Sequence, residues 1–176
     1  MFLTLKDTPL FDVPTMMARI LPPEAYKAIP YTNVVGSDGS TRELTDINPA
    51  YFIEFMNDVF GPVGFGWFYQ YESMNAEFDP DAFKGKGGWT ITISNLSLYY
   101  KYKDENGEVF TSDPVVASGG VKMQKRDHAE RGAITNALSS AGAKMGWQNW
   151  VYKGIVHHGN VAQAYKHQQE QAATTA

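Results

Sequence analysis

Residues 89–103 read WTITISNLSLYYKYK, and this stretch decides the fold. Its apolar residues occupy odd positions up to Ile93 and even positions from Leu96, so the alternation typical of a half-buried strand changes phase near Asn95. A β-bulge or a strand break at that point would bring both halves onto the same face. We therefore predict a long strand that is irregular at residues 94–95.

The flanking residues predict partners for this strand. Asp104-Glu-Asn-Gly107 is typical of a hairpin turn, and residues 108–118 then form the returning strand, in which Pro114 implies an edge or a bulge. Upstream, residues 67–71 are rich in aromatic side chains and indicate another strand, which is followed by a loop. The middle of the chain is thus expected to be an antiparallel sheet.

Two helices are expected on either side of the sheet in sequence. Apolar residues recur at helical spacing over 49–60, after Asn48-Pro49 and before Gly61-Pro62. A second helix begins at Asp127, which forms a variant capping box with Glu130, and it ends at Gly146. Its apolar stripe consists largely of alanine, so its backbone can lie close to a sheet. The predicted fold class is α+β, with an antiparallel β-sheet packed against helices in a single domain.

The two ends of the chain are expected to be less regular than the core, which spans residues 48–152. Residues 1–47 are rich in turn signals, including a loop or hairpin tip at 36–40, and are expected to wrap around the core. Residues 153–176 lose the apolar period and become rich in Gln, Ala and Thr, which predicts a frayed helix or a disordered tail.

Composition limits the class of protein. With 176 residues, of which 43% are hydrophobic, the chain is long enough to bury a sizeable core. It has no cysteine, which removes disulfides and thiolate sites and fits a reducing compartment. The sequence shows no run of about 18 apolar residues, and Lys6 and Asp7 interrupt any signal-peptide pattern. We expect a cytoplasmic protein that makes no contact with a membrane.

The charge of −4 is unevenly distributed. Residues 1–87 carry 6 basic and 12 acidic residues, whereas residues 121–146 carry 5 basic and 2 acidic ones. A single-stranded nucleic acid needs cations along its backbone and flat side chains on which its bases stack. Lys6 and Lys153 are expected to lie outside such a site. The candidate DNA-binding residues are Lys101 and Lys103, which share a strand face with Tyr99, then Lys122, Lys125, Arg126, Arg131 and Lys144, and finally Lys84 and Lys86 in a glycine-rich loop.

Short motifs resemble a known family. They are the stretch from Asn57 to Trp67 (NDVFGPVGFGW), the strand pair around the turn at 104–107, and RGAITNAL at 131–138 followed by Met145-Gly146. Together they resemble the annealing domain of the Rad-fifty-two superfamily, a broad group that includes phage annealing proteins. The resemblance implies a β-β-β-α core, a homo-oligomeric ring or helical filament, and single-stranded DNA lying in a basic groove. It also implies that ATP is not used.

One part of the family pattern is missing. The family's helix usually has a Lys-Arg pair and a further Arg where this chain has Ser139, Ser140 and Ala143, so those phosphate contacts cannot be carried over. The resemblance implies single-stranded DNA binding and strand annealing in recombination or repair, with a single-strand-binding protein or an exonuclease as candidate partner. The alternative is an assembly protein that keeps the oligomeric fold and binds DNA weakly or not at all.

The sequence does not favour other chemistry. Glu77, Asp79 and Asp81 lack the glycine and closing glutamate of a calcium loop, and His157-His158 have no carboxylate at ligand spacing. Gly85 to Gly88 is not followed by the Gly-Lys-Ser/Thr of a phosphate loop, and no nucleophile-elbow motif is present. We therefore expect a protein that is not an enzyme and needs no cofactor or metal. A small enzyme or nuclease is the least favoured hypothesis.

Overall fold

One long strand organises the protein in the computed structural model, which describes residues 1–35 and 41–175. β6 (Gly88–Lys103) pairs on one edge with β4 (Trp67–Gln70) and β5 (Ser73–Asp79), and on the other with β7 (Val109–Thr111) and β8 (Val115–Met123). All these pairings are antiparallel. Tyr102 pairs with both Thr4 and Phe110, so β1 (Leu3–Thr4) extends the edge opposite β7. The predicted α+β class with an antiparallel sheet in a single domain is confirmed.

β6 contains the irregularity that the change of phase predicted. Its pairing with β8 shifts between Ile93 and Leu96, and Asn95 has a φ of 50°, in the left-handed region. The backbone N–H of Asn95 donates a hydrogen bond to Ser118 Oγ at 3.2 Å. The bulge returns the apolar residues to the face that they occupied before it. The fully buried residues of this face of β6 are Ile91, Ile93, Leu96 and Leu98.

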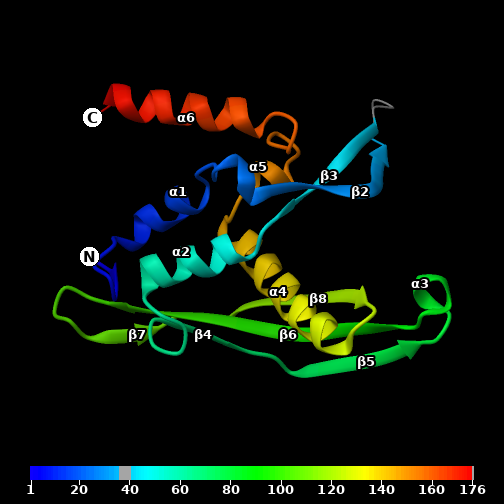
Figure 1. Ribbon diagram of the computed structural model, residues 1–176. Coiled ribbons are helices and arrows are strands. Elements are labelled where there is room, and N and C mark those ends of the chain that lie inside the picture. The colour runs from blue at the N-terminus through cyan, green and yellow to red at the C-terminus, as the bar shows by residue number, and fades with distance from the viewer. Residues whose placement is uncertain (36–40, 176) are drawn as a thin grey trace.

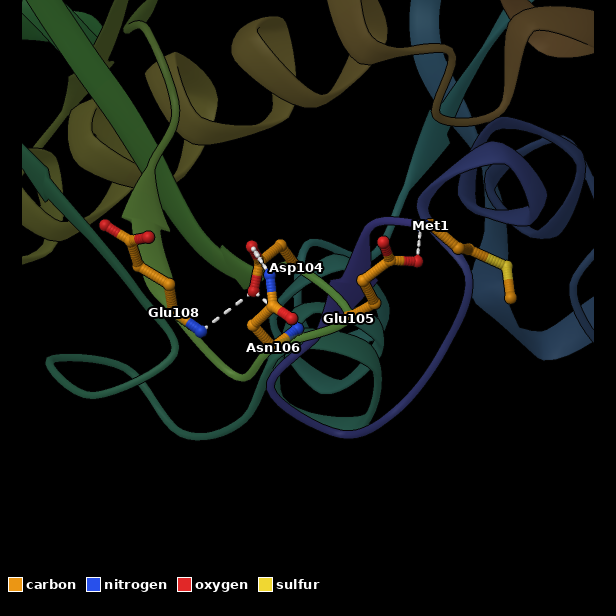
Figure 2. Close-up of polar contacts among 5 residues, drawn as sticks. All are labelled: Met1, Asp104, Glu105, Asn106 and Glu108. Carbon is orange, nitrogen blue, oxygen red and sulfur yellow. Dashed lines mark hydrogen bonds and ion pairs between the residues drawn. The ribbon is translucent and has the colours of Figure 1, made fainter.

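A single carboxylate holds the turn that follows β6. Asp104 Oδ1 accepts hydrogen bonds from the backbone N–H groups of Asn106 and Glu108, both at 2.9 Å (Figure 2). The amino group of Met1 lies 3.2 Å from Glu105 Oε2, so this turn also contacts the segment that carries β1. The returning strand is divided into β7 and β8 around Pro114. The predicted hairpin and its interruption are confirmed.

Helices α2 (Ala50–Phe60) and α4 (Arg126–Met145) lie on the same face of the sheet (Figure 1). α2 starts where the sequence predicts, with Asn48 Oδ1 accepting the Ala50 N–H at 3.1 Å. Its Phe52 is buried, and a Cβ placed on Gly142 of α4 would lie 2.6 Å from the Phe52 ring. The two helices therefore contact each other where the Phe52 ring packs against Gly142. This contact closes one side of the core.

Helix α4 comes unusually close to the sheet. A Cβ at Gly119 of β8 would lie 2.3 Å from the backbone nitrogen of Ala137 and 2.8 Å from the carbonyl oxygen of Ala133. Only a residue without a side chain fits there. The helix meets the sheet through side chains spaced by one turn, all completely buried: Ala129, Ala133, Ala137 and Ala141.

The ends of α4 differ in how well the sequence predicts them. Gly146 has a φ of 107° and ends the helix, as expected. The predicted capping box is wrong, because the N-cap residue is Lys125 and no side chain caps the helix. The two carboxylates of the expected box are engaged by arginines one turn away: Asp127 by Arg131 at 2.9 Å and Glu130 by Arg126 at 2.8 Å.

Both ends of the chain are more regular than the sequence analysis predicts. β2 (Tyr26–Val35) and β3 (Thr41–Ile47) form an antiparallel hairpin within the segment expected to be irregular, while the expected tip at 36–40 lies outside the described residues. Residues 73–79, expected to be a loop, form β5. The segment 153–176, expected to be a frayed helix or a disordered tail, contains helix α6 (Val161–Thr175). The remaining elements are short: 3-10 helices at Leu10–Asp12 and Pro23–Ala25, and helices α1 (Val13–Met17), α3 (Ala82–Gly85) and α5 (Asn149–Tyr152).

Helix α6 is tied to the N-terminal part of the chain by one side chain. Gln168 Oε1 accepts a hydrogen bond from the Ile20 N–H at 2.8 Å, and Gln168 Nε2 donates to the Ile20 carbonyl at 3.0 Å. Val161 at the start of the helix is buried. These contacts explain why residues 161–175 dock rather than fray.

In the part of the chain that is described, no helix is both long and apolar enough to span a bilayer.

We predict that Gly119→Ala lowers the free energy of unfolding by at least about 2 kcal/mol, because the new methyl group must push α4 away from β8. Chemical unfolding followed by circular dichroism measures this. The matched control is Gly120→Ala, one residue along the strand on the other face, where the nearest atom to a Cβ is the Ile91 carbonyl oxygen at 3.2 Å. Equal losses in the two variants would contradict the close contact with the helix.

Candidate functional site

A groove with a volume of about 1150 Å³ opens beside α4, and we call it the α4 groove. One wall is the polar face of α4 above the last residues of β8. The other wall is formed by β3 and by the segment from α5 to His158. On α4 the lining residues are Gly132, Thr135, Asn136, Ser139 and Ser140. On the opposite wall the polar lining residues are Thr45, Asp46, Tyr152, Lys153, His157 and His158.

The α4 wall follows from the pattern of the helix sequence. Its lining residues recur three and four positions apart, so they form one face, while the alanine stripe faces the sheet. No lining residue on this wall is ionisable. The opposite wall holds a lysine, two histidines, an aspartate and a tyrosine. Burial, together with the nearby carboxylate of Asp46, raises the pKa of Tyr152.

A buried polar cluster holds the hairpin wall against the rest of the protein. The Tyr26 hydroxyl donates to Gln148 Oε1 at 2.5 Å and accepts the Leu21 N–H at 2.9 Å, and Gln148 Nε2 donates to the Arg19 carbonyl at 2.6 Å. Tyr26 is 6% exposed and Gln148 1%. Desolvation by burial raises the pKa of Tyr26 to about 12. The cluster joins the start of β2 to the chain just after α4.

The candidate DNA-binding residues do not form a single patch. Tyr99, Lys101 and Lys103 share the face of β6 opposite the helices, as the alternation predicts, and Phe68 stacks on Tyr99 at 4.9 Å. Lys122 pairs in register with Thr90, near the other end of β6. A strand rises about 3.3 Å per residue, so Lys101 and Lys122 lie about 35 Å apart. Lys84 and Lys86 follow β5, at the Lys122 end of the sheet.

Several of these cations already contact other groups. Lys101 lies over the Phe65 ring at 5.9 Å. The polar contacts are Lys103 with Asp7 at 2.5 Å, Lys122 with Asp79 at 2.6 Å, Arg126 with Glu130 at 2.8 Å, Arg131 with Asp127 at 2.9 Å, and Lys144 with the Val116 carbonyl at 2.6 Å. Exposed ion pairs contribute about 0 to 1 kcal/mol, so a phosphate can replace the carboxylate at little cost.

Two of the candidate cations lie at the N-terminal end of the helix that forms one wall of the α4 groove. Arg131 is one helical turn before the lining residue Thr135, and Lys125 is the N-cap residue of the same helix. The N-terminal end of a 20-residue helix carries a partial positive charge, which adds to these cations. This end of the groove therefore attracts anions.

The α4 groove includes residues that were not among the candidates. Lys153, expected to lie outside a DNA-binding site, lines the wall opposite α4, and its ammonium lies 5.7 Å from the centre of the Trp150 ring. His157 and His158 line the same wall. The signal that could have found this wall is the run of aromatic and basic residues from Trp150 to His158.

Comparison with known proteins does not identify the site. No protein-family model, curated protein or solved structure matches the chain. Within the described residues, no three or more His, Cys, Asp or Glu side chains gather in a way that could hold a metal ion. The function of the protein has therefore to be inferred from the groove and its charges.

We predict that Tyr26→Phe lowers the free energy of unfolding by about 1–3 kcal/mol at pH 7, because two buried hydrogen-bonding groups lose their partner.

The variant also tests the pKa of Tyr26. Since the folded protein favours the neutral phenol, the contribution of Tyr26 to stability is fully present below pH 10 and is lost as pH rises through about 12. The difference in free energy of unfolding between the wild type and the variant should therefore shrink between pH 10 and 12 in unfolding titrations.

The control for this variant is Tyr99→Phe, whose hydroxyl accepts an exposed hydrogen bond from Gln70 at 3.2 Å. It should change stability by less than about 0.5 kcal/mol. If the two variants lost equal stability, the cluster of Tyr26 and Gln148 would not be what holds the hairpin wall.

Proposed function

We propose that this protein binds single-stranded DNA in the α4 groove and anneals complementary strands without ATP. The observation that carries the proposal is the position of the groove, which is lined by residues of the segment 119–140, within the region of local basic excess at 121–146. A single-stranded nucleic acid needs cations along its backbone and flat side chains on which its bases stack. Lys153 and the rings of Tyr152 and His157 line the groove.

The fold agrees with what the family resemblance implies. Strands β4 and β5, β6, and β7 and β8 followed by α4 make a β-β-β-α unit, and the groove lies on the helix of that unit. Arg131 and Lys125 would contact phosphates at the N-terminal end of α4. There Arg131 would replace its exposed ion pair with Asp127 by one with a phosphate of the DNA. Annealing then requires only that two bound strands meet and pair.

A specific observation favours a second candidate function. The α4 wall has no ionisable side chain, and on the opposite wall Asp46 offsets the charge of Lys153, so the groove itself is nearly neutral. An assembly protein that retained the fold but bound DNA weakly would have this property. Salt-dependent binding distinguishes the two functions, because contacts with phosphates release counterions.

We predict that the wild type binds a labelled single-stranded oligonucleotide with an affinity that falls as salt rises. The double variant Lys125→Ala/Arg131→Ala should bind more weakly. Its slope of log K against log salt should be less steep by about 1.4, at about 0.7 for each lost phosphate contact. Filter binding or fluorescence anisotropy over a salt series measures both quantities.

The matched control for the salt series is Lys166→Ala on α6, whose side chain is 80% exposed and does not line the groove. It should leave the slope unchanged. An unaltered slope in the double variant would place the DNA elsewhere. A wild type with no salt-dependent binding would favour the assembly protein.

We also propose that the protein forms a homo-oligomer. Among the described elements, no helix covers the face of the sheet opposite α2 and α4 (Figure 1). That face carries the stacked pair Phe68 and Tyr99, and Val116, which is 40% exposed. Apolar and aromatic side chains on an uncovered sheet face are typical of an interface between subunits.

Light scattering at micromolar concentration should therefore give a mass that is a multiple of 19.6 kDa. Val116→Glu should reduce that mass, because a charge would be buried in the interface. Gln163→Glu on the exposed surface of α6 introduces the same charge and should leave the mass unaltered. A monomeric wild type would rule out this part of the proposal.

A further inference from the structure

The two long edges of the sheet differ in how they are covered. On β8, side chains of α4 bind the strand backbone: Asn136 Nδ2 donates to the Gly120 carbonyl at 3.0 Å, and Lys144 Nζ donates to the Val116 carbonyl at 2.6 Å. β5 lies at the opposite rim (Figure 1), and among the described elements β6 is its only partner strand. An edge strand directs the N–H and C=O groups of alternate residues away from its partner. Those groups of β5 can pair with another strand.

β5 lacks the features that protect most edge strands from such pairing. Its sequence, SMNAEFD, contains no proline and no lysine. It pairs with β6 from Ser73 to Asp79 without a register shift, so no bulge turns the edge away. The strand is therefore a regular template for a second extended segment.

The core-facing side of β5 is left uncovered at this rim. Residues that pair directly across two strands share a face of the sheet. The β5 residues on the core face are the register partners of Ile93, Ile91 and Trp89, namely Met74, Ala76 and Phe78. Met74 packs against the core, whereas Phe78 is 55% exposed. The apolar face of the sheet thus continues to an open edge.

The sequence of β5 is complementary to itself. A two-fold axis perpendicular to the sheet would place two copies of β5 side by side in antiparallel orientation. Paired residues must share a face, so the axis passes through a residue and not between two residues. An axis through Glu77 would oppose two carboxylates. An axis through Ala76 pairs the whole strand, with Phe78 opposite Met74 of the second copy, Glu77 opposite Asn75, and Asp79 opposite Ser73.

We propose that two copies of this chain pair through β5 about an axis at Ala76 and form one continuous sheet. Each exposed Phe78 ring then extends the core beside Met74 of the other copy, and each carboxylate of β5 faces a neutral polar side chain. This inference rests on the proposed function and its homo-oligomer, and it adds a contact at the edge of the sheet.

The symmetry of this contact serves annealing. An axis perpendicular to the sheet keeps α4 of both copies on the same side, so both α4 grooves lie on that side. It also reverses direction along the sheet. Single strands bound in the same way in the two grooves therefore run antiparallel, as complementary strands must in order to pair.

Cysteine cross-linking tests the contact, because the chain has no cysteine of its own. Two residues that lie directly opposite each other in an antiparallel pair have Cα atoms about 4.5–5.5 Å apart, within the range of about 4.4–6.8 Å that a disulfide spans. Ala76→Cys should therefore form a covalent dimer under mild oxidation, seen on a non-reducing gel. The matched control is Ser73→Cys, whose offset across the axis separates the two positions by about 20 Å and should prevent cross-linking.

A charge at the axis provides an independent test. Ala76→Lys opposes two ammonium groups, so it should lower the mass measured by light scattering and slow the annealing of complementary oligonucleotides. Its affinity for an oligonucleotide short enough for one groove should stay unchanged. An equal mixture of Ala76→Lys and Ala76→Glu should restore both mass and rate, because lysine then faces glutamate. Asn75→Lys adds the same charge opposite Glu77 and should keep both, and circular dichroism checks that each variant is folded.

Four outcomes would overturn the contact. If the wild type were oligomeric but both cysteine variants, or neither, cross-linked, the homo-oligomer would stand and the pairing through β5 would fail. A cross-link only through Ser73→Cys would reject the axis at Ala76. Failure of the mixture to recover mass would also reject it. A monomeric wild type that still bound oligonucleotides with a salt-dependent affinity would remove the contact and leave DNA binding intact.

Discussion

The close contact between α4 and β8 is the constraint on which the rest of the structure depends. Because the helix backbone lies against Gly119, only alanine fits between the helix and the sheet at the surrounding positions. The remaining apolar volume is filled by β6 and α2, whose Phe52 reaches Gly142. A helix pressed so closely to the sheet leaves its polar face fully outside the core. That face is the wall on which the α4 groove is built.

The second wall depends on contacts of another kind. The start of the hairpin β2–β3 is held to the chain after α4 by the hydrogen bonds around Tyr26 and Gln148, and Tyr26 also belongs to a buried apolar cluster with Val156 and Val161. Hydrogen bonds are directional, so this cluster fixes an orientation as well as a distance. The groove thus joins a wall set by packing to a wall that also depends on polar geometry. The two walls differ in charge as well, because the ionisable lining residues all lie opposite α4.

Much of the fold could be predicted because its signals are local. The phase change near Asn95, the turn at 104–107 and the glycine after Phe60 each constrain neighbouring residues. β5 was missed because it is an edge strand with polar and charged residues on much of its length, such as Asn75 and Glu77. The groove could not be predicted, because β3 lies far before α4 in the chain and no local pattern shows that the two face each other.

The distance in sequence between these contacts has a consequence for how the protein is made. Tyr26 bonds to Gln148, and Ile20 bonds to Gln168, across 122 and 148 residues. The strands of the sheet and α4 are all synthesised by residue 146, whereas residues 17–26 must wait for Gln148 and Gln168. Synthesis at about 5–20 residues per second adds Gln168 about 1–4 s after residue 146. The nascent protein can therefore form its sheet and α4 before the N-terminal segment docks on α6.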